Sequence, residues 1–501
     1  MKTTLHIIRI LCCGTLLFMT MACNDWLDVK SETEAKEEDL FDKVSGFKAA
    51  LTGLYMDLAD VDAYGERLTM TDIEELACMW YCDGYDYNPD YYYLHKHEYS
   101  NDYAKDDVKS IYQQMFNIIT QVNVLLMNIK DNSAALDDDP QLKQLITGEA
   151  YAIRALCQFD VLRIFGQLPQ GLGSRNVKLP YSFTTNINEI PHYYSYNDYV
   201  ELLMSDIENA LKYLKESDPV MDYPLEQLNS TYYVNFDDDF YYYRRMRLNY
   251  WAVKALKARM DMYLGNEDMA HDEAVEVITA TTSSGSAVVQ LGADDNLASN
   301  YNTLPTEHLF ALSKYDVFSY TNTLLLGSSG AQVTPNRHLV LSMDMLNQLF
   351  QGTDLSANNR YLNLWYRKSA NSQGVNFATL NKYYFNTSNG SASMVYQSII
   401  PMIRLSEMYL IAMETANDVG EANTWYTTYM RDHKIIPAEN FFTTMEEVKA
   451  EVINEYRREF FAEGQMFYVY KRKFITEMLW SDNTMSENDY IVPLPDTEYE
   501  N

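Results

Sequence analysis

Positive charge is scarce in this sequence. Lys and Arg number 39 in 501 residues against 71 Asp and Glu, which gives a formal net charge of −32. Proteins that bind nucleic acid carry clustered basic side chains, and electrostatic attachment to an anionic bilayer surface needs them as well. The composition therefore argues against nucleic acid and against an anionic lipid surface as partners.

Cysteine is also scarce, with six residues. Three of them lie within the first 23 residues, and the others are Cys78, Cys82 and Cys157. Three is an odd number, and these cysteines lack the paired spacing of a zinc site. We expect three buried thiols in the folded part of the chain, not a disulfide framework or a metal centre.

The motifs that mark common catalytic sites are absent as well. The sequence has no His-Glu-x-x-His zinc motif, no Gly-rich phosphate loop and no nucleophile elbow. Residues 86–90 and 235–239 alternate oxygen ligands like the start of a calcium loop, but both lack its later Gly and Glu. We therefore predict a protein that is not an enzyme and needs no cofactor, with calcium as the weaker alternative. A carboxylate pair for glycoside hydrolysis also stays open, because the separation of the two groups depends on the fold.

A hydrophobic run long enough to cross a membrane is missing from the N-terminus. The apolar stretch at residues 10–19 follows two basic residues and is typical of a signal peptide. The sequence Thr-Met-Ala-Cys that follows it resembles a bacterial lipobox ending at Cys23, and lipid on this cysteine would anchor the chain without a spanning helix. We expect a lipoprotein signal peptide at 1–22, a lipidated tether at 23–45 and the folded domain at 46–501. Cleavage near Ala22 without lipid is the alternative.

What the sequence has in abundance is amphipathic helical periodicity. Apolar residues recur at helical spacing over 47–60, 111–129, 140–165, 196–214, 248–265, 399–418 and 443–464. No regular alternation of strands and helices competes with this pattern. The long irregular stretches between the helices are rich in Tyr, Asn and Asp, and they span 61–105, 166–195, 216–243, 280–340 and 352–395. We predict a single, mostly α-helical domain that carries an irregular, loop-rich lobe.

Five segments carry more specific motifs. They read GEAYAIRALCQFDVLRIFGQLP, LNYWAVKALKARMDMYLGN, MIRLSEMYLIAME, EYRREFFAEGQMFYVYKRK and VPLPDTEYEN, and they begin at residues 148, 248, 402, 455 and 492. In this order they resemble the conserved segments of the SusD/RagB family of outer-membrane nutrient-binding lipoproteins, with small departures at Tyr456 and at Tyr468-Val469. The resemblance implies that the helices pair into a tetratricopeptide-like superhelix, with the lobe packed against it.

We interpret these motif residues as structural and not as ligand contacts. Gly166 and Gly464 each follow a helical pattern, and we expect positive φ at both because glycine adopts it at little cost. Arg404 and Glu407 are spaced i, i+3 and are expected to pair within their own helix.

The family resemblance also implies a function. It implies non-catalytic capture of a nutrient at the cell surface by a lipoprotein of the outer membrane, which delivers the ligand to a SusC-like TonB-dependent transporter. An oligosaccharide or polysaccharide is the first ligand class. A peptide, as in the RagB branch, is the main alternative, and a purely structural transporter subunit and a surface hydrolase are the others.

Tyrosine supplies the candidate ligand contacts, with 42 copies in the chain. An aromatic ring stacks on the apolar face of a sugar, and a phenol adds one hydrogen-bonding group. Segment 79–103 concentrates such rings among Asp and Asn, and loops past the middle of the chain add more, among them Tyr301, Tyr315, Phe318 and Tyr366. We predict ligand contacts at Trp80, Tyr81, Tyr85, Tyr87, Asn88, Tyr91, Tyr320, Trp365 and Arg367. The competing interpretation is that these side chains face the transporter or the core.

Overall fold

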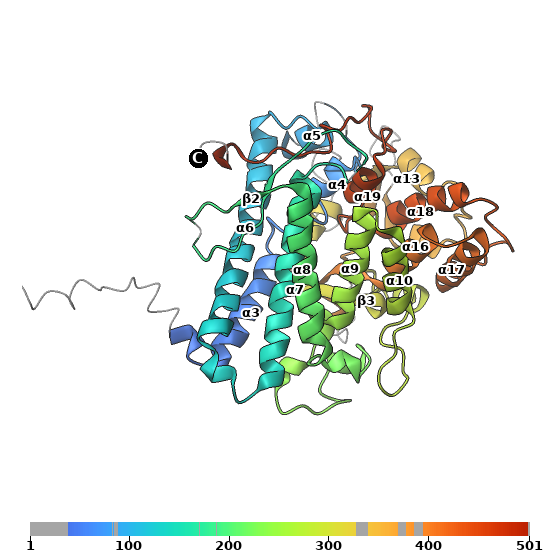
Figure 1. Cartoon of the computed structure of the whole chain (residues 1–501). Coiled ribbons are helices and arrows are strands. Elements are labelled where there is room, and N and C mark those ends of the chain that lie inside the picture. The colour runs from blue at the N-terminus through green and yellow to red at the C-terminus, as the bar shows by residue number, and fades with distance from the viewer. Residues whose placement is uncertain are drawn as a thin grey trace, which may run out of the picture.

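The long helices lie side by side and follow one another in space nearly in sequence order (Figure 1). The structure is a computed structural model that describes residues 39–82, 84, 89–169, 171–186, 188–326, 339–368, 377–384 and 394–498. The long helices are α3 (Val44–Leu58), α6 (Asp102–Asp131), α7 (Pro140–Phe165), α8 (Tyr196–Lys215), α9 (Tyr250–Leu264), α10 (Glu267–Ile278), α16 (Leu405–Glu414), α17 (Val419–Asp432) and α18 (Met445–Glu459). Helix α6 packs on α7, α7 on α8, α8 on α9, α9 on α10 and α10 on α16. The prediction of a mostly α-helical chain with paired helices is confirmed.

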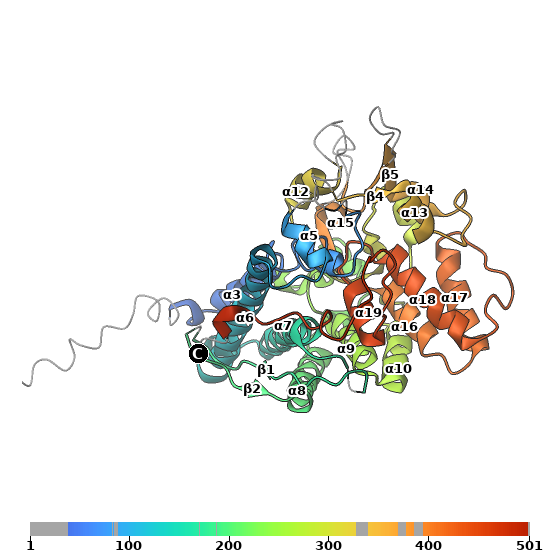
Figure 2. The ribbon, with the colours of Figure 1, turned by 90° about the horizontal axis from the view of Figure 1, so that it is seen from above.

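Some of the shorter elements form the irregular lobe. Figure 2 shows several of them, including α5 and α12–α15, gathered along one side of the row of long helices. The short helices are α4 (Asp72–Leu76), α5 (Pro89–His95), α11 (Ala293–Ala298), α12 (Val317–Thr321), α13 (Met343–Leu349), α14 (Asn359–Asn363), α15 (Met394–Gln397) and α19 (Met466–Lys473). The strands are β1 (Leu179–Pro180), β2 (Tyr193–Tyr194), β3 (His308–Ser313), β4 (Leu341–Ser342), β5 (Trp365–Lys368), β6 (Phe377–Leu380) and β7 (Ile399–Arg404). They pair antiparallel as β1-β2, β3-β7 and β4-β6-β5.

Segment 399–418 differs from its prediction. The sequence pattern favoured one helix, but the first six residues form strand β7, and α16 begins only at Leu405. Strand β7 pairs with β3, with Phe310 opposite Ile403 and Leu312 opposite Ile400. All six residues of β7 are buried, and a fully buried apolar strand has no alternation that would distinguish it from a buried helix.

Helix α7 shows why its ends are so clearly marked in the sequence. The Asp139 carboxylate accepts a hydrogen bond from the Leu142 backbone N–H at 3.0 Å, and Pro140 occupies the first turn. At the other end, Gly166 has φ of −75°, so the expectation of positive φ is wrong at this position. A Cβ atom there would lie 2.3 Å from the Leu162 carbonyl oxygen. Glycine is therefore required by close packing of the backbone.

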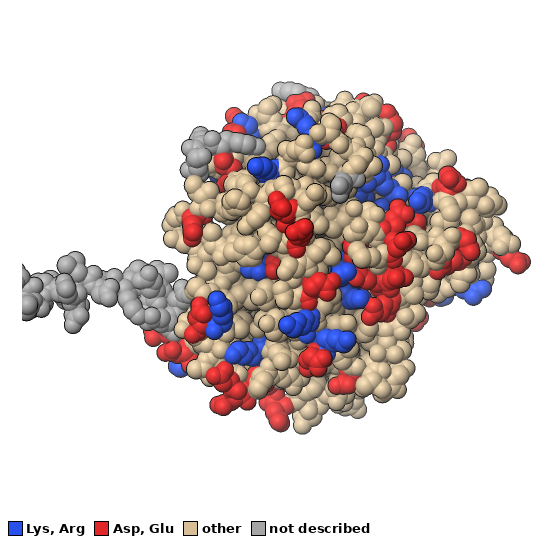
Figure 3. Space-filling view, viewed as in Figure 1, with Lys and Arg blue, Asp and Glu red and all other residues tan. Residues whose placement is uncertain are grey.

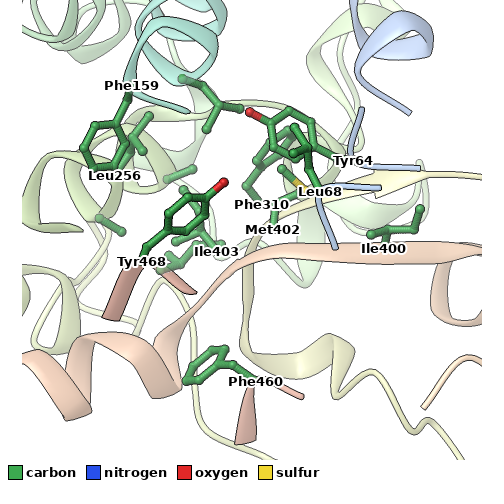
Figure 4. Packing of buried hydrophobic residues seen from close by; sticks show 14 of the residues in the cluster. Tyr64, Leu68, Phe159, Leu256, Phe310, Ile400, Met402, Ile403, Phe460 and Tyr468 are labelled. Carbon is green, nitrogen blue, oxygen red and sulfur yellow. The ribbon is translucent and has the colours of Figure 1, made fainter. Parts of the chain in front are cut away.

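Side chains from distant parts of the chain meet in one core. Figure 4 shows Tyr64 from the loop after α3, Phe159 from α7, Leu256 from α9, Phe310 from β3, Met402 from β7 and Tyr468 from α19. The buried cluster extends from Phe41 to Val492. Both ends of the described chain therefore contribute to the same core.

Several charged residues of the five motif segments are buried and pair over long sequence distances. Arg154 makes two hydrogen bonds of 2.7 Å to Asp206 on α8. Glu407 accepts a hydrogen bond from Arg259 Nε at 2.8 Å, whereas Arg404 pairs with Glu459 and Glu463. The expected pair of Arg404 with Glu407 is therefore wrong, since both side chains point to other elements.

The three cysteines of the described chain are free thiols. Cys78 and Cys157 are buried as expected, but Cys82 is only half-buried. Burial raises the pKa of Cys78 to about 12 and that of Cys82 to about 11. Both thiols are therefore protonated at neutral pH.

The face of the molecule that carries the long helices shows acidic and basic side chains interspersed among larger uncharged areas (Figure 3). This pattern differs from the continuous basic footprint of a nucleic-acid-binding surface. Among the residues that the structure describes, no helix combines the length and the apolar character needed to cross a membrane.

Glu74 on α4 makes stability depend on pH. Its side chain is fully buried and accepts a hydrogen bond from the Gly464 backbone N–H at 2.9 Å. Burial raises its pKa from 4.5 to about 8. A carboxyl group whose pKa is higher in the folded than in the unfolded state destabilises the fold as pH rises between those two values.

In the wild type, we expect Glu74 to lower the free energy of unfolding by about 1.4 kcal/mol per pH unit as the pH rises from about 5 to about 8. We expect Glu74→Gln to abolish this decrease. Urea unfolding of the wild type and the variant at pH 5 and pH 8 measures this difference. Glu439→Gln, at an exposed position, is the control and should follow the wild type. Equal pH dependence in Glu74→Gln and the wild type would contradict the assignment.

Candidate functional site

The lobe carries aromatic side chains from several segments that are exposed or half-buried. We call this set of side chains the lobe surface and define it by Tyr81, Tyr91, Tyr315, Phe318, Tyr320, Tyr366, Phe377 and Tyr384. Two contacts join its segments: the Tyr81 backbone N–H donates to the Val340 carbonyl at 2.9 Å, and the Tyr320 hydroxyl donates to the Gly65 carbonyl. The N-terminal loops and the loops past the middle of the chain, in which the sequence analysis placed the candidate ligand contacts, therefore meet.

Tyr81 and Phe377 form one aromatic pair of this surface. Their ring centroids are 5.5 Å apart, and the rings meet edge to face at 61°. Phe377 lies at the start of β6, opposite Lys368 of β5. Tyr81 is half-buried, so part of its side chain remains accessible to a ligand.

Phe318 and Tyr384 form a second pair, with ring centroids 5.6 Å apart. In the same lobe, Tyr315 is 79% exposed and Tyr366 is 47% exposed. Large exposed aromatic side chains that gather on one surface are typical of a binding site. The lobe surface thus combines fixed rings with freely accessible ones.

The phenols of this surface are neutral hydrogen-bonding groups. Burial, and then the nearby carboxylate of Glu66, raises the pKa of Tyr91 and of Tyr320. Both hydroxyls therefore stay protonated at physiological pH. The Tyr320 hydroxyl already donates to the Gly65 carbonyl, so it can only accept a hydrogen bond from a ligand. The Lys314 ammonium lies 5.8 Å from the Tyr320 ring centroid and adds a positive charge at the edge.

Two predicted ligand contacts are wrong, because Trp80 and Trp365 belong to the core. Trp80 is 0% exposed, and its indole N–H donates to the Met70 carbonyl at 2.9 Å. Trp365 is 2% exposed. Both rings pack edge to face against Phe461, at centroid distances of 4.7 and 5.0 Å. On β5 the side chains alternate between faces, so Trp365 points inward and Tyr366 outward.

Other predicted residues lie outside the described part of the chain. These are Cys23, Tyr85, Tyr87, Asn88 and the side chain of Arg367. Tyr81, Tyr91 and Tyr320 are half-buried at the lobe surface. Their contact with a ligand stays a prediction.

Phe377 and Tyr384 were missed by the sequence analysis. The aromatic run Tyr383-Tyr384-Phe385 was a signal of the same kind as segment 79–103. The run alone could not show which of its residues is accessible. Tyr383 is buried, and its hydroxyl donates to the Ala462 carbonyl at 2.7 Å.

The described residues contain no group of three or more His, Cys, Asp or Glu side chains arranged to hold a metal ion. In segment 235–239, Asp238 pairs with Lys48 and accepts a hydrogen bond from the Phe240 backbone N–H at 2.9 Å. Residues 86–88 of the other acidic segment lie outside the described chain. Calcium binding at these two places stays a prediction.

Two segments of the chain match models of known protein families. Residues 25–221 match a SusD-like family described as starch-binding and associating with the outer membrane, and residues 347–501 match the SusD family itself. The chain belongs to the SusD/RagB family. Members of this family are binding proteins associated with the outer membrane. No curated protein sequence matches the chain.

Solved SusD structures share the fold. A SusD superfamily protein from Bacteroides thetaiotaomicron is 20% identical with a TM-score of 0.66, covering 91% of this chain and 98% of its own. A laminarin-binding SusD-like protein is 16% identical with a TM-score of 0.62, covering 91% and 97%. A SusD-like carbohydrate-binding protein from Bacteroides vulgatus is 14% identical with a TM-score of 0.59, covering 86% and 83%. At these identities the likeness establishes the SusD fold.

Proposed function

We propose that this SusD/RagB protein captures an oligosaccharide or polysaccharide at the cell surface, using the lobe surface. The observation that carries the proposal is that three tyrosines on separate segments of the lobe are exposed, namely Tyr315, Tyr366 and Tyr384. Rings of this kind stack on the apolar faces of sugars, and their hydroxyls bond to sugar hydroxyls. The carbohydrate-binding and laminarin-binding proteins among the structural neighbours support the same ligand class.

In this proposal the protein has no catalytic step. Lipid on Cys23 holds it at the outer membrane, and it passes its ligand to a SusC-like TonB-dependent transporter. The family resemblance supports both features. Binding and release are then the whole mechanism, and the energy for import is supplied by the transporter.

The proposal predicts that the double variant Tyr315→Ala, Tyr366→Ala binds its polysaccharide at least about tenfold more weakly. Truncation of well-placed aromatic contacts commonly costs more than about 1 kcal/mol each, and tenfold corresponds to about 1.4 kcal/mol. Affinity electrophoresis of the purified protein against laminarin, starch and other polysaccharides measures the change. Casein-derived peptides, tested by calorimetry, probe the peptide alternative.

Tyr232→Ala is the matched control, because Tyr232 is 86% exposed and lies outside the lobe surface. It should leave retardation unchanged. Retardation that survives in the double variant would contradict the proposed site. Peptide binding without any polysaccharide retardation would replace the glycan with a peptide, and turnover of either would overturn the non-catalytic role.

A further inference from the structure

A cavity of about 510 Å³ lies among residues that are not part of the lobe surface. It is lined by the segment after Pro224, by residues 286–290, by Tyr301 and by Tyr396 of α15. Its volume falls within the range of about 300–1,000 Å³ that is usual for small-molecule sites. We propose that this cavity is a second, independent binding site for a neutral sugar unit.

Two tyrosines give the cavity an aromatic wall. The ring centroids of Tyr301 and Tyr396 are 5.3 Å apart, and the rings are tilted by 32°. Both residues are half-buried, so part of each side chain is accessible. Such a pair offers the flat apolar surface on which one face of a pyranose ring packs.

Glu226 is held beside this wall by two partners. One carboxylate oxygen accepts a hydrogen bond from the Tyr396 hydroxyl, and the other accepts one from Arg245 Nη2 at 3.1 Å. A carboxylate has about four acceptor positions, so two remain for ligand hydroxyls. Burial and the hydrogen bond to Glu226 raise the pKa of Tyr396 to about 12, which keeps this hydroxyl protonated.

Arg245 supplies the observation that points to a ligand. The residue lines the cavity and is 2% exposed, yet its Nε and Nη1 have no hydrogen-bond partner among the residues that the structure describes. Buried donors are nearly always paired, and an unpaired one costs about 1–3 kcal/mol. A ligand or water oxygen that enters the cavity beside Arg245 would relieve this cost.

The charges of the cavity favour a neutral ligand. The carboxylates of Glu226 and Asp295 outnumber the guanidinium of Arg245, and amides such as those of Gln227 and Gln290 add uncharged polar groups to the lining. An anionic sugar would meet net negative charge, whereas neutral hydroxyls can donate to the carboxylates and accept from the amides. We therefore assign the site to a neutral hexose unit and not to a uronic acid.

Ligand-observed NMR with purified protein tests the site directly. The probes are the methyl glycosides of glucose, galactose and mannose, with galacturonate as the charged comparison. We expect at least one neutral probe to give a saturation-transfer signal that falls at least fivefold in Tyr301→Leu and in Glu226→Gln. Tyr315→Ala, Tyr366→Ala should leave this signal intact, and galacturonate should give a weaker one.

The outcomes separate this inference from the proposed function. No Tyr301-dependent signal from any neutral probe would overturn the second site, as would a signal lost only in the lobe-surface variant. A Tyr301-dependent signal in a protein that retards no polysaccharide would support the second site while contradicting the proposed function. Thermal unfolding of Tyr301→Leu and Glu226→Gln shows whether the variants are folded. Glu226→Gln should leave the fold intact, because the Glu226 side chain is exposed.

Discussion

Arg404→Ala is expected to lower the free energy of unfolding by about 3–5 kcal/mol. The Arg404 guanidinium is 1% exposed and lies between the carboxylates of Glu459, at 2.7 Å, and Glu463, at 2.9 Å. It also donates to the Glu459 backbone carbonyl at 2.9 Å and lies 4.5 Å from the Phe460 ring centroid. Removing one partner of a buried ion pair leaves the other charge without compensation, which typically costs about 3–5 kcal/mol.

The network around Arg404 explains why the loss is large. Arg404 and His433 hold the pKa of Glu459 well below its ordinary value, so this carboxylate is charged in the folded protein. Arg360 donates to the same carboxylate at 2.9 Å and to Glu455 at 2.7 Å. The network therefore joins β7, α14 and α18, and the loss of its central cation affects all three.

Urea unfolding at pH 7, followed by far-UV circular dichroism, measures the effect. Arg431→Ala on α17 is the control, because Arg431 is exposed and such changes usually stay within about 0.5 kcal/mol. A loss below about 1 kcal/mol for Arg404→Ala would show that the network does not stabilise the fold.

Gly464→Ala should destabilise the protein by about 2–5 kcal/mol. Gly464 has φ of +70°, and an added Cβ would lie 2.0 Å from the Leu68 carbonyl oxygen. The left-handed conformation costs a residue with a Cβ about 1–2 kcal/mol, and forced displacement of packed neighbours costs about 1–3 kcal/mol more. The displaced backbone belongs to the loop between α3 and α4, so the change reaches from the C-terminal motif to the N-terminal segment.

Gly265→Ala is the matched control, since it isolates the conformational cost. Gly265 has φ of +84°, but an added Cβ would meet no heavy atom within 4 Å. We expect a loss of only about 1–2 kcal/mol here. Thermal unfolding of both variants by calorimetry measures the difference, and equal losses would show that contact with Leu68 adds nothing.

Much of the helical scaffold could be predicted from the sequence because its signals are local. The predicted helix at 140–165 coincides with α7, and the predictions at 196–214 and 248–265 agree with α8 and α9 within two residues. Apolar periodicity, an Asp cap, a proline in the first turn and a terminal glycine act within one or two turns of the chain. Helices α10 and α17 were not predicted. They are rich in charged or polar residues and depend on packing against α9 and α16.

The candidate site was predicted only by region. Segment 79–103 and the loops past the middle of the chain do meet at the lobe surface. Which aromatic faces outward was not predictable, however, because Trp80 and Tyr81 are adjacent and of similar character. Burial of Trp80 depends on Phe461, which is far away in the sequence and also packs on Trp365. The cavity at Tyr301 and Tyr396 likewise joins segments that no local pattern connects.

The sequence by itself determined the helical class, the family and the positions at which the helices α7, α8 and α9 begin and end, since these follow from local spacing and motifs. The tertiary structure alone decided which residues pair, pack together or face solvent. Arg404 selects Glu459 over the nearby Glu407, and Gly166 is glycine because of the close approach of a backbone carbonyl. Trp80 and Trp365 are core residues, while Tyr315 and Tyr366 face solvent. The physical reason is that ion pairing, close packing and burial are interactions between segments far apart in the chain, and only folding brings those segments together.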